Sequence, residues 1–295
     1  MQLMKRRDFL KTGGAAIAGG ALLGASGSLA TSCLSSMDSD TSLGSTDVLV
    51  VGGGPAGVCA AIAAARNGAS TVIVEQGNCL GGMATRGLVA PFMTCYDTTG
   101  EIMVIRGIFE EVVDRMVALG GAIHPSRVRA GSPFSAWITA GHDHLTPFDA
   151  ETMKYVLDVM CEEAGVKVMF HTSLVDAMLK GNRITGIRVL NREGICTISA
   201  KVVIDATGDG DVASRAGVPC TFGNPELGTV QPATLFFHIN NVDTPALVKD
   251  VQAHLHEFRK VNGVSYRALH WHVEEAEAAG EWDIARKSVN IYRGV

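Results

Sequence analysis

The sequence predicts an α/β fold built on a parallel β-sheet, and three observations lead to this class. The wholly apolar run Val48–Val51 is typical of a strand that is buried on both faces. A glycine-rich corner follows at once, and the alanine-rich run PAGVCAAIAAARNG continues as a helix that Gly68 can end. A second apolar run, Thr71–Val74, completes a strand–helix–strand unit. Such a unit is the building block of parallel sheets.

Composition and charge limit the function. A chain of 295 residues with 47% hydrophobic residues can form one large or two ordinary domains around a globular core. The formal charge is −5, and the Lys and Arg residues are scattered, so no basic surface for nucleic acid is expected. We therefore expect a small-molecule partner and no nucleic acid. The 34 glycines exceed the usual share of about 7% and indicate tight turns or close backbone approaches.

The glycine corner has the spacing of a dinucleotide-binding turn. Gly52, Gly54 and Gly57 form GxGxxG directly after the strand, and Glu75 ends the next strand about 20 residues further on. In such a turn the second glycine lets backbone reach the diphosphate, and the acid binds a ribose hydroxyl. A merely structural glycine turn is the alternative. The residues expected to contact the dinucleotide here are Gly52, Gly54, Pro55, Ala56, Gly57, Glu75 and Gln76.

The N-terminal residues predict export. Residues 1–32 run from KRRDFLK into a weakly apolar, glycine-rich stretch, and the pair Arg6–Arg7 resembles a bacterial twin-arginine leader. That resemblance implies recognition by the export machinery, often with a cofactor already bound. An N-terminal membrane helix is the alternative. Cleavage after Ala30 and lipid attachment at Cys33 both stay open, so the protein would be periplasmic or lipid-anchored. Residues 33–46, rich in Ser, Thr and Asp, are expected to form a flexible linker.

Two further motifs identify the dinucleotide. The stretch QGNCLGGMATRGLV follows Glu75, and AKVVIDATGDGDVASRAGVP holds an apolar strand, Val202–Ile204, that opens into a glycine and aspartate turn. Together they resemble the FAD-dependent oxidoreductases of the glutathione-reductase-like fold, in particular the group carrying GGMAT and DATGDGD. The resemblance covers about residues 46–243 and implies FAD rather than NAD. It implies contacts from Gly81, Gly82, Met83 and Thr85 on the flavin side, from Leu174 along the adenine, and from Ala206, Thr207, Gly208 and Asp209.

The predicted fold is therefore a glutathione-reductase-like FAD-binding Rossmann-type parallel sheet with an inserted β-meander and a partial α+β substrate domain. Residues 47–90 and 147–224 would form the FAD-binding domain, and 91–146 and 225–295 the substrate or cap domain. The meander would comprise KVMFH, SLVDAMLKG, RITGIRVLN and ICTISA, ahead of a separate strand at Val202.

Two further helices are expected before the DATGDGD turn and two after it. Periodic apolar residues predict one helix between an Asp149 N-cap and a Gly165 stop, and another over Ile108–Leu119. Downstream, GTVQPATLFFHINNVD suggests a strand, PALVKDVQAHLHEFRKVNG one helix and WHVEEAEAAGEWDIA another. A closing strand with a glycine turn is not recognisable after Asp243. We therefore expect an N-terminal fragment whose FAD affinity is weak or absent.

No catalytic residue can be assigned from the sequence. Arg86 could hold an anionic substrate or stabilise reduced flavin, or be an ordinary surface arginine. His142 and His144 could face the flavin or be plain loop histidines. HExxH, CxxC and GxSxG motifs do not occur, so we expect no metal site and no serine hydrolase chemistry. The cysteines are expected to be buried thiols.

The expected function is an exported FAD-dependent oxidoreductase. It would transfer hydride or electrons between a small organic substrate and flavin, with an unknown electron acceptor. Disulfide reductases of the same fold carry a redox cysteine pair just after the double glycine, where this chain has Met83, Ala84 and Thr85, so disulfide chemistry is disfavoured. The alternative is a non-catalytic or truncated homologue that binds FAD or another nucleotide.

Overall fold

The computed structural model describes residues 40–138, 141–231, 233–257, 260–261, 265–266 and 270–282. The predicted leader, residues 1–32, and Cys33 lie outside the described residues, so export and lipid attachment stay predictions. In the described part of the chain, no helix is both long and apolar enough to cross a membrane.

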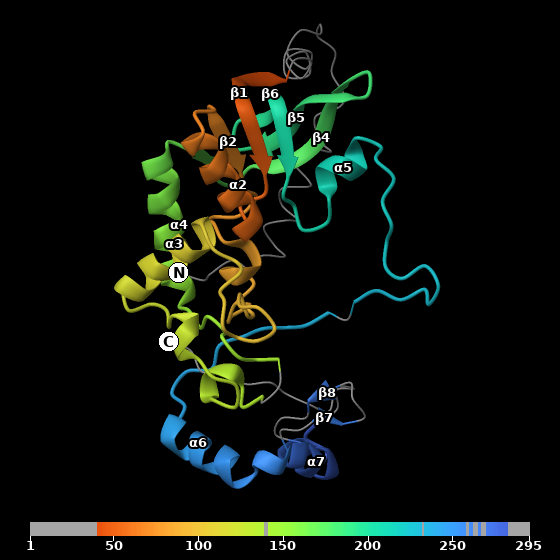
Figure 1. Cartoon of the computed structure of the whole chain (residues 1–295). Coiled ribbons are helices and arrows are strands. Elements are labelled where there is room, and N and C mark those ends of the chain that lie inside the picture. The colour runs from red at the N-terminus through yellow and green to blue at the C-terminus, as the bar shows by residue number, and fades with distance from the viewer. Residues whose placement is uncertain are drawn as a thin grey trace, which may run out of the picture. The chain divides into compact units, whose positions relative to one another are not determined.

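A six-stranded sheet with the order β3-β2-β1-β6-β5-β4 organises the first part of the molecule (Figure 1). Its strands are β1 Thr41–Val51, β2 Thr71–Val74, β3 Lys167–Met169, β4 Ser173–Lys180, β5 Arg183–Asn191 and β6 Gly194–Asp205. The helices are α2 Pro55–Arg66, α3 Ile108–Ala118, α4 Ala150–Ala164, α5 Asp211–Arg215, α6 Thr244–Ala253 and α7 His270–Ala278.

The predicted strand–helix–strand unit is confirmed as β1, α2 and β2. The two strands pair in parallel, with Val48 opposite Thr71 and Val51 opposite Val74. β1 begins earlier than the apolar run, so the last residues of the predicted linker belong to the strand. The physical reason is a contact with a distant segment: the buried Thr46 hydroxyl donates over 2.7 Å to the Ser70 carbonyl, 24 residues further along the chain.

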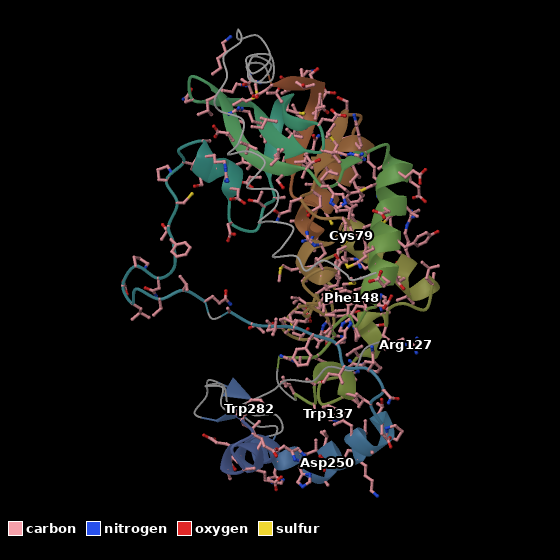
Figure 2. The ribbon with its side chains drawn as sticks, turned by 180° about the vertical axis from the view of Figure 1, so that it is seen from behind. Cys79, Arg127, Trp137, Phe148, Asp250 and Trp282 are labelled. Atoms are coloured by element: carbon pink, nitrogen blue, oxygen red, sulfur yellow. The ribbon has the colours of Figure 1, made fainter. Side chains whose placement is uncertain are left out.

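Helices α2, α3 and α4 pack together over one face of the sheet. Asp149 caps α4 by accepting the Thr152 backbone N–H at 2.7 Å, and Gly165 ends it in the left-handed region, as predicted. Phe148, labelled in Figure 2, stacks on Phe92 with ring centroids 4.5 Å apart. The fully buried side chains of this core come from the sheet, the helices and the loop after β2, and they include Val50, Val58, Ile62, Ile73, Leu80, Met116, Met153, Leu157 and Met160.

Strands β4, β5 and β6 form the meander, with two differences from the prediction. β3, expected as its first strand, instead pairs in parallel with β2. The expected break before Val202 is absent, because β6 runs without interruption from the meander into the parallel part of the sheet. Ile187 and Ile198 of the meander pack with Leu49 of β1, so the second face of the parallel strands is covered too.

The residues after α5 differ most from expectation. The stretch GTVQPATLFFHINNVD forms no strand in its described residues, and large side chains such as Phe222, Leu235 and Phe237 are exposed. The long helix expected after it stops at Ala253, and a short 3₁₀ turn, Leu255–Glu257, follows. The last predicted helix is confirmed as α7. Trp137 lies in residues 91–146, called the insert below, and packs with Val251 of α6, next in sequence to the Asp250 labelled in Figure 2.

Candidate cofactor site

The three glycines of the corner have different surroundings. A Cβ on Gly52 would lie 2.6 Å from the Ala206 carbonyl oxygen, and Gly52 has a φ of +103°. A Cβ on Gly57 would overlap the Gly52 carbonyl oxygen. These two glycines are required by the close packing of α2 against β1 and the β6 turn. Gly52 and Gly57 therefore have a structural role in the packing of the turn.

Gly54 faces open space instead. A Cβ on Gly54 would meet no atom within 4 Å. Gly54 is also the N-cap of α2, where no side chain caps the helix and no acidic residue lies in the first turn. The first N–H groups of a helix carry a partial positive charge and attract phosphates. Backbone that is open and uncapped, with no acidic residue in the first turn of its helix, therefore fits a bound diphosphate.

Glu75 lies at the carboxyl end of β2, with only 8% of its side chain exposed. Its Oε2 accepts the Gly53 backbone N–H at 2.8 Å, and its Oε1 accepts the Gly77 N–H at 2.6 Å. The Glu75 main chain is also fixed, because its carbonyl accepts the Thr172 N–H at 3.0 Å. The carboxylate is thus held beside the glycine corner, as a ribose acceptor must be.

The double-glycine loop packs directly on this corner. The Gly81 N–H donates to the Gly53 carbonyl at 2.8 Å, and both Gly81 and Gly82 have positive φ. Thr85 is fully buried, and its hydroxyl donates to the Leu80 carbonyl at 2.7 Å. The Thr85 side chain therefore braces the loop, while Met83, 66% exposed, lies on its open side.

Asp205 fixes the turn after β6, a role that the sequence analysis missed. Its Oδ1 accepts the Thr207 N–H and hydroxyl, and its Oδ2 accepts the Ala213 N–H at 2.9 Å. Burial raises the pKa of Asp205, but these hydrogen bonds outweigh it and leave that pKa below its usual value. The first Asp of DATGDGD was the available signal, since Asp side chains commonly accept backbone N–H groups in turns.

The remaining predicted contacts are placed around the same corner. The Ala206 N–H donates to the Val51 carbonyl at 2.9 Å, and the Thr207 side chain is committed to Asp205. Leu174 is half-buried at the start of β4. Gln76, Ala56, Gly208 and Asp209 are exposed. Their contacts with a cofactor stay predictions.

The three catalytic candidates have different partners. Arg86 Nη1 lies 3.3 Å from Oε1 of Glu75, the predicted ribose acceptor. His144 is buried in the insert, stacked on Tyr96 with ring centroids 4.1 Å apart and with Nδ1 3.1 Å from the Pro125 carbonyl. His142 Nδ1 lies 3.3 Å from the Ser135 carbonyl, and burial lowers the pKa of His142. Both histidines are thus held by residues of the insert.

The expectation of buried thiols is confirmed for four of the six described cysteines, Cys79, Cys95, Cys161 and Cys196, which are free thiols. It is wrong for Cys220, which is exposed because it lies in the exposed stretch that follows α5, and Cys59 is only half-buried. Burial raises the pKa of Cys161 to about 12, which keeps it protonated and unreactive. Among the described residues, no group of three His, Cys, Asp or Glu side chains is arranged to hold a metal ion.

Curated relatives match part of the chain. Thiamine thiazole synthase from Aeropyrum pernix is 30% identical over 181 residues, which are 58% of this chain and 57% of that protein. The Methanococcus maripaludis (strain C7) enzyme of the same name is 29% identical over 171 residues, 55% of each chain. This chain therefore spans somewhat more than half the length of these relatives.

The chain is also similar to solved structures and matches a family model. THI4 from Thermovibrio ammonificans is 19% identical, with a TM-score of 0.40, over 72% of this chain and 70% of that one. L-proline dehydrogenase from P. horikoshii is 15% identical, with a TM-score of 0.43, over 62% and 57%. The family model "FAD dependent oxidoreductase" matches residues 47–294. The chain belongs to the family of FAD-dependent oxidoreductases, and its cofactor is FAD.

Proposed function

We propose that this protein is an exported flavoenzyme that transfers hydride or electrons between a small organic substrate and its flavin. The observation that carries the proposal is the pairing of an open Gly54 corner with a buried Glu75 carboxylate. The bound flavin supplies a ring that accepts hydride or electrons from substrate. The chain's own residues supply binding and orientation.

The roles of the residues follow from their surroundings. The uncapped N-terminus of α2 at Gly54 would bind the diphosphate, and Glu75 would accept the ribose hydroxyls. The backbone of the Gly81–Ala84 loop would approach the flavin half, because Thr85 holds that loop against the corner. Two fixed ends orient a long cofactor better than one.

The surroundings of the double-glycine loop favour direct transfer between substrate and flavin. Met83, Ala84 and Thr85 follow the double glycine, so no thiol lies where a disulfide relay would begin. Cys79, the thiol nearest in sequence before the loop, is buried with its sulfur 3.9 Å from the Thr85 hydroxyl. A buried thiol of this kind is inert toward substrate.

Two sequence features support export and the substrate class. The Arg6–Arg7 pair and the apolar stretch behind it are typical of a leader that carries folded, cofactor-loaded proteins. A net charge of −5 without a basic stripe favours small molecules over nucleic acid as substrate.

The test is reduction of bound flavin. The FAD-loaded protein is mixed without oxygen with a panel of small amines, hydroxy acids and alcohols, and the visible flavin absorbance is followed. We expect at least one compound to bleach the bound flavin while free FAD with the same compound stays oxidised. Bound flavin that dithionite bleaches and no panel compound bleaches would instead identify a non-catalytic FAD-binding protein.

A further inference from the structure

Arg86 occupies a position that its sequence neighbourhood does not suggest. It follows the double-glycine loop, yet its guanidinium lies against Gly77 and reaches Glu75, at the other end of the cofactor corner. A Cβ on Gly77 would overlap Arg86 Nη1. The absence of a side chain at Gly77 therefore makes room for this guanidinium.

The contact between Arg86 and Glu75 is weak and leaves donors available. Arg86 Nη1 lies 3.3 Å from Glu75 Oε1, and 48% of the Arg86 side chain is exposed. An arginine carries five N–H donors, and this contact uses one of them. When the guanidinium moves away, the buried Glu75 carboxylate keeps its hydrogen bonds from the Gly53 and Gly77 N–H groups.

The acceptor sites of Glu75 show why Arg86 would move. An ionised carboxylate offers about four lone-pair positions. Oε1 already accepts the Gly77 N–H and faces Arg86, while Oε2 accepts only the Gly53 N–H among the hydrogen bonds found for it in the described residues. A ribose that uses both oxygens must displace Arg86 from Oε1.

The basic side chains of α2, α4 and α5 form ion pairs elsewhere. Arg66 at the end of α2 pairs with Glu111 at 2.6 Å, Lys154 of α4 with Glu151 at 2.6 Å, and Arg215 of α5 with Asp211 at 3.0 Å. Arg86 instead contacts Glu75, whose carboxylate accepts the N–H of Gly53, the residue before the Gly54 N-cap of α2.

We propose that Arg86 is a cofactor-binding residue: it leaves Glu75 when the adenosine ribose of FAD arrives and binds the diphosphate of FAD. Charge-assisted bonds from a guanidinium to phosphate are shorter and stronger than the 3.3 Å contact that it gives up. The inference concerns capture of the cofactor and does not depend on which substrate is oxidised.

The experiment compares ADP, which carries the adenosine ribose and a diphosphate, with adenosine, which carries no phosphate. Both are titrated calorimetrically into the cofactor-free chain and into Arg86→Gln, Arg86→Lys and the control Arg106→Gln. Arg106 is an exposed arginine paired with Glu110 on α3, so its loss changes the net charge equally.

We expect Arg86→Gln to weaken ADP binding about tenfold or more, the size of one charge-assisted hydrogen bond, and to leave adenosine binding within about twofold. Arg86→Lys should fall between, and Arg106→Gln should match the unmodified chain. Unchanged ADP binding in Arg86→Gln would overturn the inference. So would an equal loss for ADP and adenosine, which means that Arg86 acts only through Glu75, or tighter ADP binding, which makes Arg86 a competitor.

A second measurement needs no variant. Phenylglyoxal modifies accessible arginines, and mass spectrometry reports the extent at each position. ADP should protect Arg86 while adenosine does not, and Arg106 should be modified equally in both cases. Modification of Arg86 that ADP does not slow would overturn the inference even if the variants failed to fold.

Discussion

The two glycines Gly54 and Gly57 lie three residues apart in one motif, yet substitutions at them should have different effects. A substitution at Gly57 should lower stability, and one at Gly54 should abolish FAD binding. A Cβ on Gly57 would overlap the Gly52 carbonyl oxygen and lie 3.1 Å from its carbon and 3.2 Å from Ala206 Cβ. Two of these three atoms are backbone, so they cannot rotate away. Gly57→Ala should therefore cost about 3 kcal/mol, the upper end for overpacking.

Gly54→Val should spare the fold and remove the cofactor. The new side chain meets nothing within 4 Å from its Cβ, and φ of −68° with ψ of 177° suits a β-branched residue. The loss of a glycine N-cap costs about 1 kcal/mol. The side chain would stand where backbone N–H groups meet the diphosphate, and losing two such bonds at about 1.5–3 kcal/mol each weakens FAD binding more than about 100-fold.

The assay pairs thermal unfolding of the cofactor-free proteins with FAD titration. Gly57→Ala should lower the melting temperature by about 6–12 °C, and Gly54→Val by about 2–4 °C. Only Gly54→Val should combine a near-normal melting temperature with lost FAD binding. Normal FAD affinity in Gly54→Val, or a Gly57→Ala protein as stable as the parent, would refute the assignment of these roles.

Three more predictions follow from other parts of the chain. Arg6→Lys with Arg7→Lys should leave the precursor in the cytoplasm, measured by cell fractionation; unchanged periplasmic yield would point to another route. Asp205→Asn should destabilise the fold by about 1–3 kcal/mol at pH 7. Because the pKa of Asp205 is depressed in the folded state, its contribution is present above about pH 4 and is lost as pH falls through the folded pKa. The difference between parent and Asp205→Asn in urea unfolding should therefore shrink in acid, and a pH-independent difference would contradict this account. Glu75→Gln should weaken FAD binding in a titration. It should also lower the free energy of unfolding by about 1–3 kcal/mol, because the single oxygen of the amide cannot accept both the Gly53 and the Gly77 N–H as the two carboxylate oxygens do.

The parts predicted correctly from the sequence are those with local signals. β1, α2 and β2 each carry an apolar run or a glycine stop, and α4 has both its Asp149 cap and its Gly165 end in the chain itself. The hydrogen bonds that start and end a helix, or that pair the two strands of a short strand–helix–strand unit, join residues that are close in the sequence. The sequence pattern alone can therefore predict such elements.

The errors concern pairing between distant segments. β3 has a strand sequence, but only tertiary structure shows that it joins β2 in parallel instead of starting the meander. The run around Leu235 and Phe237 has strong strand propensity and still forms no strand, because it has no ladder partner among the described residues. Strand propensity is not sufficient where pairing is absent.

The cofactor corner shows the same division. The order of glycines and acid predicts the dinucleotide site, and the structure brings Glu75 onto the Gly53 N–H beside the glycines because the geometry near the turn is local. The bracing by Thr85, the clamp by Asp205 and the position of Arg86 depend on side-chain partners that spacing does not reveal. Arg86 lies in the sequence beside residues expected at the flavin, but its long side chain reaches Glu75, the predicted ribose acceptor.

A crystal structure of the chain soaked with FAD tests the central claim most directly. We expect diphosphate density within hydrogen-bonding distance of the backbone at Gly54–Gly57 and a ribose on the Glu75 carboxylate. We also expect the Arg86 guanidinium to have moved from Glu75 to a phosphate oxygen. A cofactor bound away from this corner, or at the corner with its ribose not contacting Glu75, would contradict the account.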